Sequence, residues 1–161
     1  MDSPMPSLKW PAAPLQTRQP IKGKMEVLCL ARKKWVVLEP EEWVRQHVLH
    51  HLNAVLGYPL GCMSVEHQLT LNGMSRRADI VAFTPDGTPR ILVECKAPNV
   101  ALNQDAVTQA ARYNLVLQVP VLLVTNGLKH AAFGLDDNGH ASPLAQLPAC
   151  PSLRAFTAKR G

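Results

Sequence analysis

Apolar residues recur along the chain with two different periods, which predict helices and strands in a definite order. Over residues 40–57 they recur every three to four positions, with helix-start chemistry in Pro-Glu-Glu and a glycine at the end. A second helix is expected over 102–117. The positions predicted to face inward are Val44, Val48, Leu52 and Val55 in the first helix, and Leu102, Ala106, Gln109, Ala110, Tyr113 and Leu117 in the second.

Other segments have the alternating or continuous apolar composition that is typical of strands. They cover residues 63–71, 76–83, 90–96, 120–125 and 130–135, and a short hairpin is also expected within 26–38. Asn-Gly turns follow the first and the fourth of these strands. The order αβββαββ predicts an α/β fold in which a mixed β-sheet is flanked by helices.

Prolines cluster toward both ends of the chain and divide it into three parts. Residues 1–25 are expected to form an irregular, proline-rich basic arm, and residues 138–161 an irregular tail. Residues 26–137 between them are expected to form the folded domain. A length of 161 residues fits one domain with a substantial core.

Charge and cysteine content narrow the class of protein. The formal net charge of +5 and the isoelectric point near 9.2 are compatible with a polyanionic partner such as nucleic acid. The four cysteines have no paired spacing, which indicates reduced thiols. Because no signal-peptide pattern and no apolar run of about 18 residues is present, we expect a cytoplasmic protein without a membrane span.

Two of the predicted strands carry charged side chains where a buried strand would have none. The sequence Pro-Asp-Gly-Thr at 85–88 predicts a turn between them, and symmetric pairing around this turn places Asp79 opposite Glu94. Alternation along each strand puts Arg77 and Lys96 on the same face as these acids. The opposite face of the pair holds only small or apolar residues. We therefore expect one face of the hairpin to be core and the other to carry charge.

Opposed carboxylates lie about 5 Å apart at their Cβ atoms and repel each other unless a positive charge lies between them. Arg77 and Lys96 could supply that charge in a solvent-facing cluster of ion pairs. A hard divalent cation would supply it better, because Mg²⁺ commonly takes one or two carboxylates and keeps several waters. The nearby lysine could then orient or deprotonate an attacking water.

The elements Glu94-Cys95-Lys96, Asp79 on the preceding strand and Gln109-Ala-Ala-Arg-Tyr113 on the second helix resemble the PD-(D/E)XK nuclease superfamily, with its restriction-endonuclease-like fold. Over about residues 26–136 the chain is similar to the N-terminal nuclease domain of type I restriction enzyme R subunits, in its small stand-alone form. One departure is Ala78, which stands where the superfamily has its proline. Another is the lack of a GxxxxGK[ST] phosphate loop, so ATP-driven translocation by this chain is not expected.

The resemblance implies a role for each matching residue. Asp79 and Glu94 would hold the metal, with the backbone carbonyl of Cys95 completing its shell, and Lys96 would be the catalytic lysine. Gln109 and Tyr113 would position the nucleic-acid backbone or the site. The first helix would add an acid, for which we favour Glu41 and keep Glu42 open. Candidate contacts to nucleic acid are Arg77, Arg112 and Lys129.

The function implied is that of a DNA endonuclease dependent on Mg²⁺, for which Mn²⁺ would substitute. The expected partners are DNA, other restriction-modification or helicase subunits, and a second copy of the chain in a homodimer, with no membrane. A different class is also open, namely a catalytically inactive module that binds nucleic acid or docks a partner with the same fold.

Overall fold

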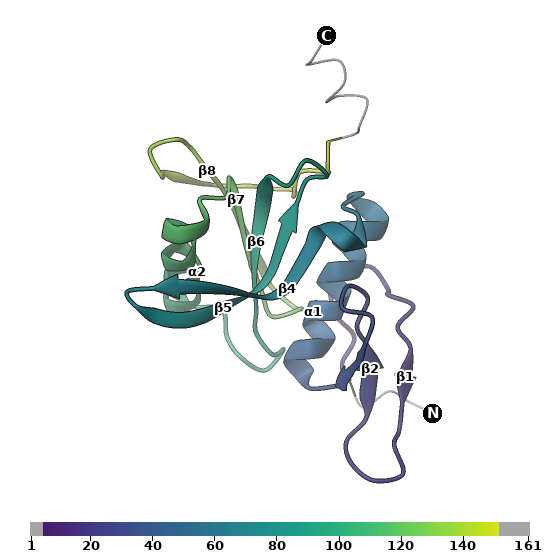
Figure 1. The fold of residues 1–161 in the computed structure, drawn as a ribbon. Helices are drawn as coiled ribbons and strands as arrows, with labels where there is room; N and C mark the ends of the chain where they lie inside the picture. Colours follow the sequence, from purple (N-terminus) through teal and green to yellow (C-terminus); the bar gives the residue numbers. More distant parts are fainter. Residues whose placement is uncertain (1–4, 152–161) are drawn as a thin grey trace.

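A six-stranded mixed sheet lies between two helices in the computed structural model, which describes residues 5–151 (Figure 1). Helix α1 (Pro40–His50) continues into a π-helical turn, η1 (His51–Val55), and covers one face, whereas α2 (Gln104–Leu117) covers the other. The strands are β4 (Met63–Leu71), β5 (Met74–Phe83), β6 (Pro89–Cys95), β7 (Val121–Thr125), β8 (His130–Leu135) and β9 (Ala141–Pro143). A 3₁₀ turn, η2 (Leu60–Cys62), precedes β4.

The strands lie side by side in chain order, β4 to β9. Every neighbouring pair is antiparallel except β6 and β7, which are parallel and joined by α2 as their crossover. The elements from α1 to β8 therefore follow the predicted order αβββαββ, and the α/β fold class is confirmed. No helix within the described residues is both long and apolar enough to cross a membrane.

Helix α1 packs through its apolar stripe onto the face of the sheet that carries Ile80, Val93 and Leu123. Val44 and Val48 are fully buried there, as predicted. Val55 was predicted to share this stripe but is 57% exposed. The reason is the π-helical turn η1, whose wider spacing rotates Val55 away from the stripe set by the α-helix before it.

Asn103 is the N-cap of helix α2, and its side chain accepts a hydrogen bond from the Ala106 N–H at 3.2 Å. It turns Ala106, Ala110 and Tyr113 toward the sheet. Tyr113 packs in a cluster with Leu92 of β6, and Ala110 packs with Val124 of β7. These three positions of the predicted inward face are therefore confirmed, whereas Leu102 precedes the helix and Gln109 and Leu117 are only partly buried.

The register of β5 and β6 agrees with the one predicted from the turn, with Ile80 opposite Val93 and Val81 opposite Leu92. The expectation that only one face of this hairpin is core was wrong. Val81 and Leu92, on the face assigned to the charged residues, are fully buried under α2. Both faces are covered because a crossover helix lies on the side opposite α1.

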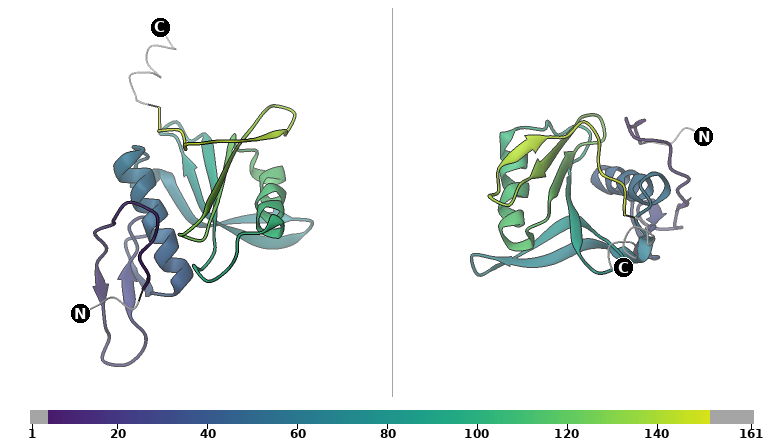
Figure 2. Two further views of the ribbon diagram at one scale, coloured as in Figure 1. Left: turned by 180° about the vertical axis from the view of Figure 1, so that it is seen from behind. Right: turned by 90° about the horizontal axis from the view of Figure 1, so that it is seen from above.

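The β4–β5 hairpin bends sharply in the middle of both strands. The pairing between them skips Glu66 and Asp79, and Glu66 has a φ of 53°, in the left-handed region. On one side of the bend the strands belong to the sheet. On the other side, residues 67–78 form an arm that extends beyond β6 toward α2, as Figures 1 and 2 show.

Two segments expected to be irregular contain short strands. β1 (Thr17–Arg18) pairs with β2 (Glu26–Leu28), which pairs with β3 (Trp35–Val37) in a separate three-stranded sheet. Near the other end, β9 pairs with β8. β1 and β9 are only two and three residues long, and each is defined by its pairing with the strand next to it in sequence rather than by its own composition.

The first described residues also pack on the domain. Trp10 donates from Nε1 to the Thr125 Oγ1 at 3.3 Å, and the Lys9 N–H donates to the Gly127 carbonyl at 2.7 Å. Leu8 contacts the core cluster beneath α1. Contacts with residues far along the chain therefore hold residues 8–10, which belong to no helix or strand, against the domain.

Candidate functional site

The pairing of β5 and β6 ends where the two acids predicted to oppose each other begin. The Cys95 N–H donates to the Asp79 Oδ2 at 2.7 Å, and the Asp79 N–H makes a long hydrogen bond of 3.4 Å to the Glu94 Oε1. Each carboxylate thus accepts a hydrogen bond from the main chain of the other strand, where main-chain pairing of β5 and β6 would otherwise continue. Asp79 is 9% exposed and Glu94 is 4% exposed. The sheet itself holds two buried carboxyl groups together at this point.

Burial raises the pKa of Glu94 strongly, and the charge of Asp79 raises it further. Lys96 acts in the opposite direction but does not cancel these effects. Glu94 therefore keeps its proton well above the pH at which an exposed glutamate loses it. A cation placed between the two acids would favour the ionised form of both.

The two candidate acids of the first helix have different surroundings. Burial raises the pKa of Glu41, the charge of Asp79 adds to this effect, and Arg45 and Lys96 oppose it. Glu41 is therefore within electrostatic reach of the predicted centre. Glu42 instead accepts hydrogen bonds from Arg45 at 2.9 Å and from Arg32 at 2.8 Å. Glu42 is therefore engaged by two arginines, and Glu41 stays the favoured candidate for the additional acid.

Arg45 was not identified from the sequence, although it contacts a predicted site residue directly. Its Nη2 donates to the Asp79 Oδ1 at 2.9 Å, and its Nη1 donates to Glu42. Burial alone would lower the pKa of Arg45, but the charges of Glu42 and Asp79 outweigh it and raise that pKa. The one local signal was the place of Arg45 beside Val44 and one turn before Val48 and Leu49, which are all apolar.

Lys96 follows the last residue of β6 and is half-buried. Its N–H donates to the Thr125 carbonyl on β7 at 2.8 Å, which anchors the backbone at the strand end. Its ammonium group lowers the pKa values of both Glu41 and Glu94.

The thiol of Cys95 points into the opposite core, as predicted, and burial raises its pKa well above the usual value. Cys95 is therefore no thiolate nucleophile.

The donor atoms present fit a hard cation with few protein ligands. No cluster of three or more histidine, cysteine, aspartate or glutamate side chains poised around one point occurs within residues 5–151. Mg²⁺ needs only one or two carboxylates because it retains waters, and Asp79 and Glu94 supply two. Each Asp79 oxygen has accepted one hydrogen bond and keeps a further lone pair.

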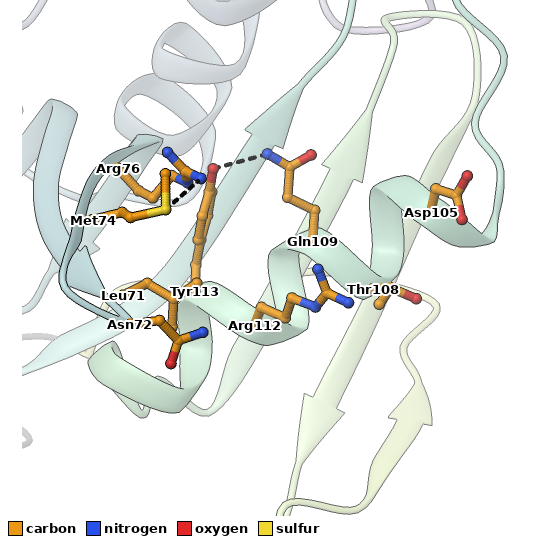
Figure 3. A pocket seen from close by; sticks show the side chains of 9 residues that line it. All are labelled: Leu71, Asn72, Met74, Arg76, Asp105, Thr108, Gln109, Arg112 and Tyr113. Atoms are coloured by element: carbon orange, nitrogen blue, oxygen red, sulfur yellow. Dashed lines mark hydrogen bonds between the residues drawn. The ribbon is translucent and has the colours of Figure 1, made fainter.

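Gln109 and Tyr113 lie together in a groove between α2 and the arm of the β4–β5 hairpin (Figure 3). The Gln109 Nε2 donates to the Tyr113 hydroxyl oxygen at 2.8 Å. Tyr113 packs in one cluster with Ala78, the residue before Asp79, and with Leu92, two positions before Glu94. In the described part of the chain, no hydrogen bond joins this pair to Asp79, Glu94 or Lys96.

The three basic residues predicted to contact nucleic acid are in different places. Arg112 lines the groove. Arg77 is exposed on β5 and does not line the groove. The cation that pairs with Asp79 is Arg45 and not Arg77. Lys129 is exposed in the turn between β7 and β8, also outside the groove. Arg76, for which the sequence predicted no role, does line the groove.

Comparisons with known proteins agree with this architecture. Residues 40–148 match the family described as type I restriction enzyme R protein N terminus (HSDR_N). Among solved structures, a fragment assigned as an HsdR subunit of a type I restriction enzyme from Vibrio vulnificus YJ016 superposes with a TM-score of 0.53 at 23% identity. The alignment covers 76% of this chain and 26% of that one, so this chain spans about a quarter of its length.

A second solved structure is a DUF820 protein from Anabaena variabilis ATCC 29413, assigned as a nuclease, with a TM-score of 0.44 at 13% identity. That alignment covers 81% of this chain and 83% of the other. The search of curated proteins gave no match. The first of the two structures supports the fold, and the family match extends over most of the chain.

Proposed function

Because the chain belongs to the family of type I restriction enzyme R protein N termini, we propose that it is a Mg²⁺-dependent nuclease that hydrolyses phosphodiester bonds of DNA. The observation that carries the proposal is the pair of buried carboxyl groups at the point where β5 and β6 separate. Main-chain hydrogen bonds hold both acids there, and Lys96 comes two residues after Glu94. If the two acids belonged only to a solvent-facing cluster of ion pairs, they would not have to be buried.

In this proposal the side chains of Asp79 and Glu94 hold the metal, and the backbone carbonyl of Cys95 would be a further ligand. When bound, Mg²⁺ supplies charge stabilisation at the phosphate and lowers the pKa of water. Glu94 has to release its proton to become a ligand, and its raised pKa means that lower pH opposes this step. Metal affinity should therefore rise with pH.

The remaining residues act on the substrate and the water. Lys96 would orient the attacking water or stabilise negative charge that develops at the phosphate. Glu41, whose pKa is raised by burial and by the charge of Asp79, would hold or accept a proton. Mn²⁺ would substitute for Mg²⁺ because it also prefers oxygen ligands.

A non-catalytic module with the same fold is the second candidate. The observation that favours it is that both Asp79 oxygens already have donors, Arg45 and the Cys95 N–H. In such a module Arg45 would take the place of the metal permanently. DNA, further restriction-modification or helicase subunits and a second copy of the chain are proposed partners for either candidate.

Cleavage of supercoiled plasmid in the presence of Mg²⁺ separates the two candidates. We expect Lys96→Met and Asp79→Asn to reduce the cleavage rate at least about a hundredfold. The matched control is Lys22→Ala in the β1–β2 loop, which removes an exposed charge and should cleave at the parent rate. Equal cleavage by Lys96→Met and the parent chain would rule out the assigned centre.

A further inference from the structure

The groove beside α2 has two walls that come from parts of the chain far apart in sequence. One wall is the tip of the β4–β5 hairpin, with Leu71, Met74 and Arg76, and the other is one face of α2, with Gln109, Arg112 and Tyr113 (Figure 3). Its volume of ≈ 450 Å³ lies within the range of about 300–1,000 Å³ that is typical of ligand clefts. The groove is open along one side, as a site for a long chain has to be.

Two guanidinium groups in the groove form no ion pair with any acid among residues 5–151. Arg76 makes only weak contacts with its own strand, to the Ser75 carbonyl at 3.4 Å and the Met74 Sδ at 3.6 Å. Arg112 is exposed, and within residues 5–151 it forms no ion pair and no side-chain hydrogen bond. Both arginines therefore keep their donors available for a ligand that carries negative charge.

The neutral groups between the two arginines also favour donation to a ligand. Because the Tyr113 hydroxyl oxygen accepts a hydrogen bond from Gln109, its own proton is free to be donated. Leu71 and Met74 add apolar surface on the hairpin wall. The groove also contains one acid, Asp105, which lies away from Tyr113 and the hairpin in Figure 3. Negative charge would therefore favour the end of the groove that Arg76 and Tyr113 form.

The groove is connected to the proposed nuclease centre through β5. Arg76 and Asp79 are three positions apart on one strand, which corresponds to about 10 Å at the rise of about 3.3 Å per residue. That distance equals about three nucleotide steps of B-form DNA. Tyr113 packs against Ala78, the residue before Asp79. A polynucleotide strand in the groove could thus extend along β5 as far as the acids.

We propose that this groove binds the phosphodiester backbone of one DNA strand, with Arg76 and Arg112 contacting phosphates a few nucleotides from the bond that is cut. The inference rests on the proposed function for the location of the cut, but the binding itself needs no metal. Its ligand is the sugar-phosphate chain, because Arg76 and Arg112 supply the positive charge that phosphates attract, and most protein–DNA hydrogen bonds go to phosphate and sugar. We expect little sequence preference.

The test measures binding of a fluorescein-labelled single-stranded oligonucleotide by anisotropy in EDTA, with a duplex of the same sequence as a second arm. The double variant Arg76→Ala/Arg112→Ala should weaken binding about tenfold or more, and each single variant should weaken it less. The slope of log affinity against log salt should become shallower by about 0.7 for each phosphate of the single strand that the variant no longer neutralises. Lys22→Ala, with the charge change of one single variant but in the distant β1–β2 loop, should bind within twofold of the parent.

Unchanged affinity in the double variant would overturn the proposal. Weaker affinity with an unchanged salt slope would also overturn it, because the two arginines would then not neutralise phosphates. A loss confined to the duplex arm would contradict binding of one strand. Binding through the groove with no Mg²⁺-dependent cleavage would count against the proposed nuclease alone. Cleavage that persists when the groove contributes nothing to binding would count against this inference alone.

Discussion

Arg45 and Arg112 are on helices that cover opposite faces of the same sheet, and their surroundings are opposite too (Figure 2). Arg45 is 6% exposed and is bound between Glu42 and Asp79. Arg112 is exposed and, within the described residues, has no acidic partner. A buried charge needs a partner to be tolerated, whereas an exposed one does not. The comparison separates charges that hold the fold and the acids in place from charges that are available to a ligand.

The largest expected effect comes from removing the buried arginine. Arg45→Met would leave Asp79 without its cation in a buried site, and breaking a buried pair in this way costs roughly 3–5 kcal/mol. We expect a loss of that size in the free energy of unfolding, measured by urea denaturation. Arg112→Met is the matched control and should change stability by no more than about 0.5 kcal/mol. Equal losses in the two variants would remove the distinction between the two arginines.

A second effect concerns how stability depends on pH. The pKa of Glu94 is raised in the folded chain, so over the range from its ordinary value of 4.5 upward the folded state retains a proton that the unfolded state releases. Stability is therefore lost as pH rises through this window, by up to about 1.4 kcal/mol per pH unit from this group. Glu94→Gln should remove that part of the slope.

Urea denaturation between about pH 5 and pH 8 measures the difference. Glu39→Gln, at an exposed glutamate just before α1, is the control and should keep the slope of the parent chain. If Glu94→Gln and the parent lose stability in parallel as pH rises, Glu94 does not carry a raised pKa in the folded state.

The smallest effect is expected in the groove. Tyr113→Phe removes the acceptor of the Gln109 hydrogen bond, and because the Gln109 side chain is only partly buried, water can replace that acceptor. The loss of stability should therefore be about 1 kcal/mol. Affinity for the labelled single strand should fall by a few-fold because one donor is gone. Denaturation and anisotropy measure the two quantities, and a stability loss above about 3 kcal/mol would show that the pair holds the fold instead.

The local parts of this structure could be predicted from sequence because short-range physics determines them. The turn at 85–88 fixed the register that puts Ile80 opposite Val93, and the helix-start chemistry of Pro-Glu-Glu marked the first helix. The strand β4 and the strand β8 have the predicted limits, since turn residues bound each of them. Asp79 and Glu94 were paired by the same counting, and their side chains do bond across the two strands.

What the sequence did not show depends on contacts between distant segments. No spacing rule links Arg45 to Asp79, because the two residues are 34 positions apart. The sequence analysis therefore assigned Arg77, and not Arg45, as the arginine beside the acids. The bend at Glu66 was also hidden, and it carries the hairpin arm with Arg76 over to α2. The burial of Val81 depended on the crossover helix that lies on that face.

The central claim is that Asp79 and Glu94 together hold a divalent cation, and a crystal structure of the chain soaked in Mn²⁺ tests it most directly. The anomalous signal of Mn²⁺ should lie between the two carboxylates, within coordinating distance of an oxygen from each. Glu94→Gln soaked under the same conditions should lose that signal or weaken it strongly. Full occupancy at another place, or no signal between residues 79 and 94 in crystals whose protein still cleaves DNA, would contradict the account.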